Sequence, residues 1–181
     1  MTIRRVITGH DPNGSAIVVS DGRPSRIVEF NSVNGLSVTL LWETKRDGVI
    51  SNGDSDPSAS ARSFVPEMGG ANLMLVVLPP KSAREYPDFD PEVAAKEYHE
   101  KLPGLAESHE PGGTGMHKTE TVDYAVVLDG EVHLELDLET VKLVKHDVVI
   151  QNGTRHAWRN KSDLPAKMLF VLLGAERKSA D

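Results

Sequence analysis

The stretch GMHKTETVDYAVVLDGEVHLEL (residues 115–136) decides the fold. Asp129-Gly130 in its middle is a dipeptide typical of tight two-residue turns between antiparallel strands. The segments on either side, Thr121–Leu128 and Glu131–Leu136, are rich in residues that favour strands. The stretch therefore predicts two β-strands joined as a hairpin.

More short strands are expected on the C-terminal side, separated by turn signals at Lys145-His146-Asp147 and Asn152-Gly153. Many short strands at regular spacing are typical of a closed barrel or a sandwich. We expect this β core to span residues 112–175. The additional strands are Val141–Val144, Val148–Gln151, His156–Asn160 and Lys167–Leu173.

The N-terminal part, residues 1–78, predicts a β extension that contains a flexible loop over residues 44–70. The loop includes the polar run KRDGVISNGDSDPSASARS, and loops of this length are either functional lids or disordered segments. Turn clusters separate the early strands of this part. The expected strands are Ala16–Val19, Arg26–Phe30, Ser37–Trp42 and Asn72–Leu78.

Residues 79–111 predict a helical connector with one short helix, which runs from Asp90 to Leu102. Asp90 suits the N-cap, Pro91 the first helical position, and Pro103-Gly104 the end. The length of 181 residues favours treating residues 1–181 as one domain.

Composition narrows the range of partners and chemistries. The chain has 20 Lys and Arg against 27 Asp and Glu, a net charge of −7, and no basic run, which argues against nucleic acid or a membrane surface as partner. It has no cysteine, which excludes disulfides, thiolate nucleophiles and Cys-ligated metal sites. The N-terminus lacks the apolar core of a secretory signal, and we expect a cytoplasmic protein.

A row of polar side chains leads into the first strand of the opening stretch. Because side chains alternate along a strand, His117, Thr119, Thr121 and Asp123 share one face. Burying such groups without partners is costly. A metal, a small-molecule ligand or an internal hydrogen-bond network is therefore expected beside them. His156, which follows a glycine turn at the start of another strand, is the best candidate for a further metal ligand.

The same region resembles the small cupins, which carry two motifs. The first is Gly, five residues, His-x-His, three or four residues, Glu, six residues, Gly. The second is Gly, five residues, Pro-x-Gly, two residues, His, three residues, Asn. The resemblance covers residues 112–175 well and the N-terminal half only loosely. The positions that keep the motif spacings are His117, Asp123 and Gly130 in the first, and Gly153, His156 and Asn160 in the second.

Four positions depart from the cupin pattern. Thr119 stands where the second histidine of the first motif belongs, and Asp123 replaces the glutamate. In the second motif, Gln151 replaces the proline and His146 replaces the first glycine. The usual cupin metal ligands, three histidines and one glutamate, are thus not all present.

The resemblance implies an all-β cupin double-stranded β-helix with a reduced metal pocket of His117, Asp123 and His156. That set is similar to the two-histidine, one-carboxylate triad of Fe(II) enzymes. Asp123 is either a direct ligand or a group that orients a ligand histidine. Asp123, Thr119 and Thr121 are the candidate catalytic residues, the two threonines positioning water or substrate.

The preferred function is a metal-binding enzyme that acts on a small organic metabolite, in its lead version an Fe(II)-type oxygenase. Mn, Ni or Zn are alternative metals. A non-oxidative isomerase, lyase or decarboxylase, in which Asp123 and His117 do acid–base work with or without a metal, is the second hypothesis. A non-catalytic small-molecule-binding cupin is the third. Exposed strand edges at the N-terminus can pair with another chain, and small cupins are commonly dimers, so we expect a homodimer.

The other candidate residues carry simpler expectations. By parity Tyr124 points away from the pocket, and His133 shares the outward face with Glu131 and Glu135. Trp158 shares parity with His156 and either lines the cavity or, as we expect, packs in the core. Arg159 is expected on the surface. Glu97 and Lys101 form a solvated helical ion pair. No ligand role is expected for His10, His99, His109 or His146.

Overall fold

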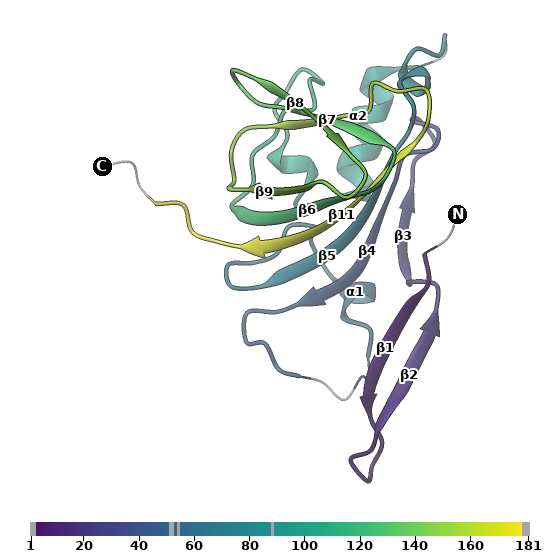
Figure 1. Cartoon of the computed structure of the whole chain (residues 1–181), viewed down its shortest axis with the longest axis vertical. Coiled ribbons are helices and arrows are strands. Elements are labelled where there is room, and N and C mark those ends of the chain that lie inside the picture. The colour runs from purple at the N-terminus through teal and green to yellow at the C-terminus, as the bar shows by residue number, and fades with distance from the viewer. Residues whose placement is uncertain (1–2, 51–52, 54, 88, 179–181) are drawn as a thin grey trace.

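The computed structural model describes residues 3–50, 53, 55–87 and 89–178, and it is built mainly of β-strands (Figure 1). The strands of the N-terminal half are β1 (Arg5–His10), β2 (Ala16–Gly22), β3 (Arg26–Glu29), β4 (Ser37–Thr44) and β5 (Ala71–Leu78). Those of the C-terminal half are β6 (Thr121–Asp129), β7 (Glu131–Glu135), β8 (Thr140–Val144), β9 (Val148–Gln151), β10 (Ala157–Arg159) and β11 (Ala166–Gly174). The helices are α1 (Pro57–Ser60) and α2 (Pro91–Lys101), with 3-10 turns η1 (Lys81–Arg84) and η2 (Ala106–Ser108).

Two antiparallel sheets face each other across one core. The larger has the strand order β3-β4-β5-β11-β6-β9, and the smaller has the order β10-β7-β8. Val127 and Met168 from the larger sheet and Val132 and Leu134 from the smaller sheet belong to the same cluster of buried apolar side chains. This arrangement confirms the all-β prediction.

The hairpin predicted at Asp129-Gly130 is wrong, although both of its strands are present. β6 pairs with β11 and β9, whereas β7 pairs with β10 and β8, so the chain changes sheets at this turn. Gly130 has φ of 76°, and a Cβ there would lie 2.9 Å from Cα of Ala166. The glycine therefore serves a tight corner between the two sheets, because no side chain fits against the neighbouring backbone.

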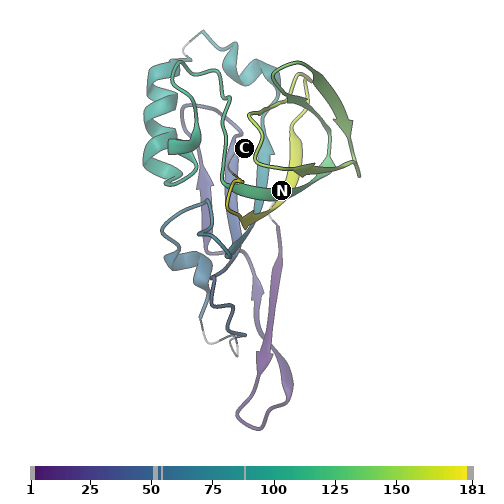
Figure 2. The ribbon, with the colours of Figure 1, turned by 90° about the vertical axis from the view of Figure 1, so that its left-hand side faces the viewer.

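The N-terminal strands have two different fates. β3, β4 and β5 extend the larger sheet, and β5 pairs with β11 along its whole length. β1 and β2 pair only with each other and project from the body as a two-stranded hairpin (Figures 1 and 2). Every residue of β2 is exposed. β1 was not among the strands expected from the sequence.

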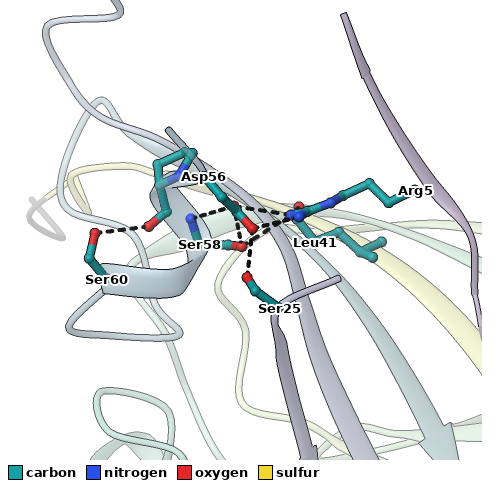
Figure 3. Close-up of polar contacts among 7 residues, drawn as sticks. Arg5, Ser25, Leu41, Asp56, Ser58 and Ser60 are labelled. Carbon is teal, nitrogen blue, oxygen red and sulfur yellow. Dashed lines mark hydrogen bonds and ion pairs between the residues drawn. The ribbon is translucent and has the colours of Figure 1, made fainter. Parts of the chain in front are cut away.

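The expected loop over residues 44–70 contains the short helix α1, and Phe64 in it is fully buried. Asp56 caps α1 by accepting a hydrogen bond from the backbone N–H of Ser58 at 3.1 Å, and it pairs with the guanidinium of Arg5 (Figure 3). The same guanidinium donates to the carbonyl of Leu41 at 2.7 Å. Although burial raises the pKa of Asp56, hydrogen bonds from Arg5, Ser25 and Ser58 hold it well below its ordinary value. This network ties the loop to β1 and β4.

The predicted helix is confirmed as α2, which runs alongside the two sheets (Figure 2). The carboxylate of Asp90 accepts hydrogen bonds from the first turn, at 2.8 Å from the N–H of Glu92. Glu97 does more than form a solvated pair with Lys101. Its side chain is only 12% exposed, and it also accepts the backbone N–H groups of Asn31 and Ser32 at 2.9 and 2.8 Å. These contacts hold α2 against the segment that follows β3.

Among the described residues, no helix combines the length and the apolar character that crossing a membrane requires.

Candidate functional site

Three histidines stack in a row beside one another. His109 forms an isolated β-bridge with His117, and His117 forms another with His156. The ring centroids of His109 and His117 are 4.4 Å apart with an interplanar angle of 14°, and those of His117 and His156 are 4.2 Å apart with an angle of 50°. Backbone pairing between three separate segments therefore sets the positions of the rings.

Each ring in the row has the same tautomer. The Nδ1 atoms lie 2.9, 3.1 and 2.8 Å from the backbone carbonyl oxygens of Leu105, Gly115 and Thr154, respectively. A carbonyl oxygen only accepts, so each Nδ1 carries the proton and each Nε2 keeps its lone pair. Within the described chain, none of the three Nε2 atoms has a hydrogen-bond partner. The row thus presents three free basic nitrogens.

Burial keeps these imidazoles neutral. It lowers the pKa of His117 to about 3, and the neighbouring His156 and His109 add to the effect. Burial also lowers the pKa of His156 and of His109. Desolvation disfavours the charged imidazolium, so the row is uncharged at neutral pH.

Asp123 is the buried carboxyl group of the site. It lies on the inner face of β6, it is 6% exposed, and its Oδ1 atom has no hydrogen-bond partner among the described residues. Burial raises its pKa to about 6, against the opposing effect of the Thr121 hydroxyl. The hydroxyls of Thr119 and Thr121 are 2.8 Å apart and hydrogen-bond to each other. A carboxyl group with such a pKa exchanges its proton close to neutral pH.

A cavity of about 290 Å³ joins these groups. Its wall is mainly apolar, with Met74 and Phe170 from the larger sheet, Tyr98 from α2 and Trp158 from β10. The ring of Trp158 makes edge contacts with those of His156 and Phe170 at centroid distances of 5.6 and 5.5 Å. The cavity is large enough for a small organic molecule with an apolar body.

The sequence prediction and the structure agree on most of the polar row. His117, Thr119, Asp123 and His156 all line the cavity, and Thr121 bonds to Thr119 beside it. Tyr124 points outward, as parity predicts, and is 45% exposed.

Three side chains have surroundings that the sequence did not predict. His109 lines the cavity, because the bridge to His117 brings it there from outside the predicted strands. Arg159 also lines the cavity instead of lying free on the surface, and its side chain is 24% exposed. His133 lies on the outward side of β7 but is half-buried, and its Nδ1 has no partner in the described chain. Only the position of His109, eight residues before His117, hinted at its role.

A resident metal ion fits the donor chemistry of the row but not its arrangement. A histidine whose Nδ1–H donates a hydrogen bond to a carbonyl oxygen presents its Nε2 as a typical metal ligand. However, the described residues contain no three His, Asp or Glu side chains arranged to hold a metal. The near-parallel rings of His109 and His117 explain this in part, since their Nε2 lone pairs lie in the ring planes and do not converge. No chemical step below is routed through a metal.

Comparison with known proteins agrees with this fold. Residues 107–172 match the family model of the cupin domain. This part of the chain is thus similar to a cupin domain, and the all-β cupin fold predicted from the motifs is confirmed.

The curated relatives fall into two groups. "Phomopsin biosynthesis cluster protein C'" of Diaporthe leptostromiformis is 49% identical over 69 residues, which is 36% of this chain and 36% of that protein. The chain thus matches little more than a third of the length of such relatives. "Cupin-domain-containing oxidoreductase virC" of Hypocrea virens is 26% identical over 176 residues, which is 93% of this chain and 74% of that protein.

Solved cupins are similar at low sequence identity. A cupin 2 conserved barrel domain protein from Salinispora arenicola has a TM-score of 0.40 and 14% identity, over 81% of this chain and 86% of its own. A cupin superfamily protein from Desulfitobacterium hafniense has a TM-score of 0.38 and 13% identity, over 84% of this chain and 81% of its own.

Proposed function

We propose that this protein is a cupin enzyme that transforms a small, mainly apolar organic molecule inside the barrel, with Asp123 as the group that moves a proton. One observation carries the proposal. The carboxyl group of Asp123 is buried at the wall of an apolar cavity, and its Oδ1 atom lacks a partner among the described residues. A buried carboxyl oxygen without a hydrogen-bond partner destabilises the fold, unless a bound ligand supplies that partner.

The surroundings of Asp123 suit proton transfer. Its pKa of about 6 lets it act as a base or an acid near neutral pH, where positioned groups of this kind contribute about 10²–10⁴-fold to a rate. The neutral imidazole of His117 offers a free Nε2 that accepts a hydrogen bond from a substrate hydroxyl. Thr119 and Thr121 are placed to orient a polar group of the substrate or a water molecule.

A metal-dependent oxidoreductase, in its leading form an Fe(II)-type oxygenase, is the second candidate. The three free Nε2 atoms favour it, and so do relatives that are named cupin-domain-containing oxidoreductases. A divalent ion on His117 and His156, with Asp123 or His109 completing the set, would supply redox chemistry with oxygen. This version requires at least one of these side chains to move from its position here. Mn and Ni are alternative redox-active metals, whereas Zn in the same place would act only as a Lewis acid.

The test separates the two candidates from a binding protein without catalysis. Purified protein is analysed for metal and then screened by thermal shift against small apolar aldehydes, ketones and acids. Compounds that bind are incubated in D₂O with and without oxygen, and with and without a chelator, and are followed by mass spectrometry. For the proposal, we expect turnover or deuterium incorporation that survives chelation and anaerobiosis.

Asp123→Asn is the decisive variant, and Asp163→Asn at an exposed position is its matched control. We expect Asp123→Asn to bind the compound and to lose at least about 100-fold in rate, because the proton acceptor is gone. Equal rates in wild type and Asp123→Asn would refute the proposal. Activity that needs oxygen and is restored to chelated enzyme by Fe(II) would establish the second candidate, with His156→Ala losing metal and His133→Ala keeping it. Binding without turnover in any condition would show a non-catalytic cupin.

A further inference from the structure

We infer that Arg159 makes the mouth of the cavity a carboxylate site, so that the substrate is an apolar molecule with one carboxylate group. The inference rests on the proposed function only in that the same cavity holds the substrate. Arg159 ends β10, and its side chain lines the cavity beside Gly115 and His117. Because this side chain is 24% exposed, we call this part of the cavity wall the cavity mouth.

The guanidinium of Arg159 has hydrogen-bonding capacity left over. Its Nε donates to Glu135 at 2.9 Å, and its Nη2 donates to the backbone carbonyl of Thr114. Its Nη1 has no hydrogen-bond partner in the described part of the chain. A guanidinium offers five N–H donors in a planar fork that matches a carboxylate. A ligand at the cavity mouth can therefore receive a charge-assisted hydrogen bond without displacing an existing one.

The positive charge of Arg159 is only partly balanced. Glu135 pairs with Arg159 at 2.9 Å and with Lys161 at 3.1 Å, so two cations share one carboxylate. Among the described residues that line the cavity, Asp123 is the only acidic one. The field of Arg159 reaches into the row of histidines, where it is a minor contributor, after burial, to the lowered pKa values of His109 and His117. The cavity mouth therefore favours an anion.

Gly115 shapes the backbone around this guanidinium. A Cβ at residue 115 would lie 2.7 Å from Nη1 of Arg159, and φ of Gly115 is 70°. The carbonyl of Gly115 lies 3.1 Å from Nδ1 of His117. One glycine thus allows the backbone to approach Arg159 closely while it orients an imidazole of the site. Recognition of the carboxylate and placement of the reacting part of the substrate are coupled through this loop.

The experiment compares aryl and alkyl carboxylates of about six to twelve carbons, such as 3-phenylpropanoate, with their uncharged amides. Binding is measured by calorimetry at pH 7.5 on the full chain. We expect the wild type to bind the best carboxylate at least ten times more tightly than its amide. Arg159→Gln should bring this ratio close to one and change the affinity for the amide by less than about threefold. Lys161→Gln, which also removes a partner of Glu135 but lies outside the cavity wall, should keep the ratio.

The inference is wrong if no carboxylate in the series binds better than its amide, or if Arg159→Gln keeps the preference. Should Arg159→Gln not fold, Gly115→Ala tests the same point, because a methyl group would displace Nη1 without removing the charge, and the ratio should fall. Failure here is distinct from failure of the proposed function. Asp123→Asn is expected to lose turnover and to keep the preference for the carboxylate over the amide. Arg159→Gln is expected to lose this preference in binding.

Discussion

At two adjacent positions of β6, the larger sheet reverses the usual placement of side chains. A polar side chain is buried on the inner face, and a largely apolar one is exposed on the outer face. On the inner face of β6, Asp123 is 6% exposed and has an unpaired Oδ1. Its neighbour Tyr124, on the outer face, is 45% exposed. The inner face is covered by the smaller sheet and borders the cavity. Burial on the inner face gives the carboxyl group of Asp123 an unusual pKa, which is typical of functional sites. The outer face leaves apolar side chains exposed to water, which is typical of interaction surfaces.

The outer face is apolar over three neighbouring strands. Tyr124 on β6 lies opposite Val171 on β11 and Ile150 on β9, and the next register pairs Val126 with Leu169 and Val148. Ile150 and Val148 are 54% and 60% exposed. We call these six residues the outer apolar patch. A second copy of this chain would present the same uncharged surface, and such self-complementary faces pack in two-fold dimers.

The largest difference between the faces should appear in stability. Leu40 faces inward and has no exposed surface, whereas Leu73, on the outer face of β5, is partly exposed. We expect Leu40→Ala to lower the free energy of unfolding by about 2–5 kcal/mol through lost burial and a cavity. Leu73→Ala should cost less than about 1.5 kcal/mol. Urea unfolding measures both, and equal costs would mean that the outer face is as tightly packed as the inner face.

Asp123 should make the inner face sensitive to pH. Its pKa of about 6 in the folded protein lies above the value near 3.9 in an unfolded chain. The stability that its neutral form contributes is therefore fully present below pH 4 and is lost as the pH rises through 6. We expect Asp123→Asn to be more stable than wild type by about 1–3 kcal/mol at pH 8, with the difference vanishing near pH 4.

Thermal and urea unfolding from pH 4 to pH 8 tests this prediction, with Asp163→Asn as the exposed control. A difference that stayed constant with pH would show that Asp123 has an ordinary pKa in the folded protein.

The attachment of α2, which contributes to the cavity wall, should have a smaller effect. Glu97→Ala removes the acceptor of two backbone N–H groups and of Lys101, and we expect a loss of about 1–2 kcal/mol. Glu100→Ala, whose ion pair with Lys96 is exposed, should cost less than about 0.5 kcal/mol. Faster amide exchange in α2 of Glu97→Ala alone would confirm the anchoring role, and matched exchange in the two variants would contradict it.

The smallest effect on the fold should come from the outer apolar patch, where assembly is what changes. We propose that wild type is a homodimer through this patch. Light scattering after size exclusion should give the mass of two chains for wild type and of one chain for the double variant Tyr124→Asp, Ile150→Asp. The monomer should unfold within about 0.5 kcal/mol of a dilute wild type, as for other surface changes.

Val18→Asp on the exposed strand β2 is the control for the dimer and should leave the mass at two chains. A monomeric wild type would refute the homodimer. Dissociation by Val18→Asp alone would move the interface to the N-terminal hairpin.

Local signals allowed much of this to be predicted. Helix α2 follows from Asp90 and Pro91 at its start, because capping acts within one turn. The common face of Thr121 and Asp123 follows from side-chain alternation along β6, which needs no knowledge of the partner strand. His117 and Thr119 precede β6 and also line the cavity. The spacing of the cupin motifs indicated the fold, which the match of residues 107–172 confirms.

Pairing and burial, in contrast, were decided by the tertiary structure. The sequence at Asp129-Gly130 predicts a hairpin turn. However, β6 pairs with β11, a strand that lies about forty residues further along the chain. Arg159 gave no local sign of its place, and His109 gave only its closeness in sequence to His117, because pairing with β7 and a bridge to His117 bring them to the cavity. The pKa of Asp123 also belongs here, since it arises from desolvation by elements distant in sequence. The sequence by itself determined most of the strands, the helix and part of the polar row, because these depend on neighbours along the chain. Only the tertiary structure decided which strands pair, which side chains meet at the cavity and how strongly their charges are desolvated, because these depend on contacts through space.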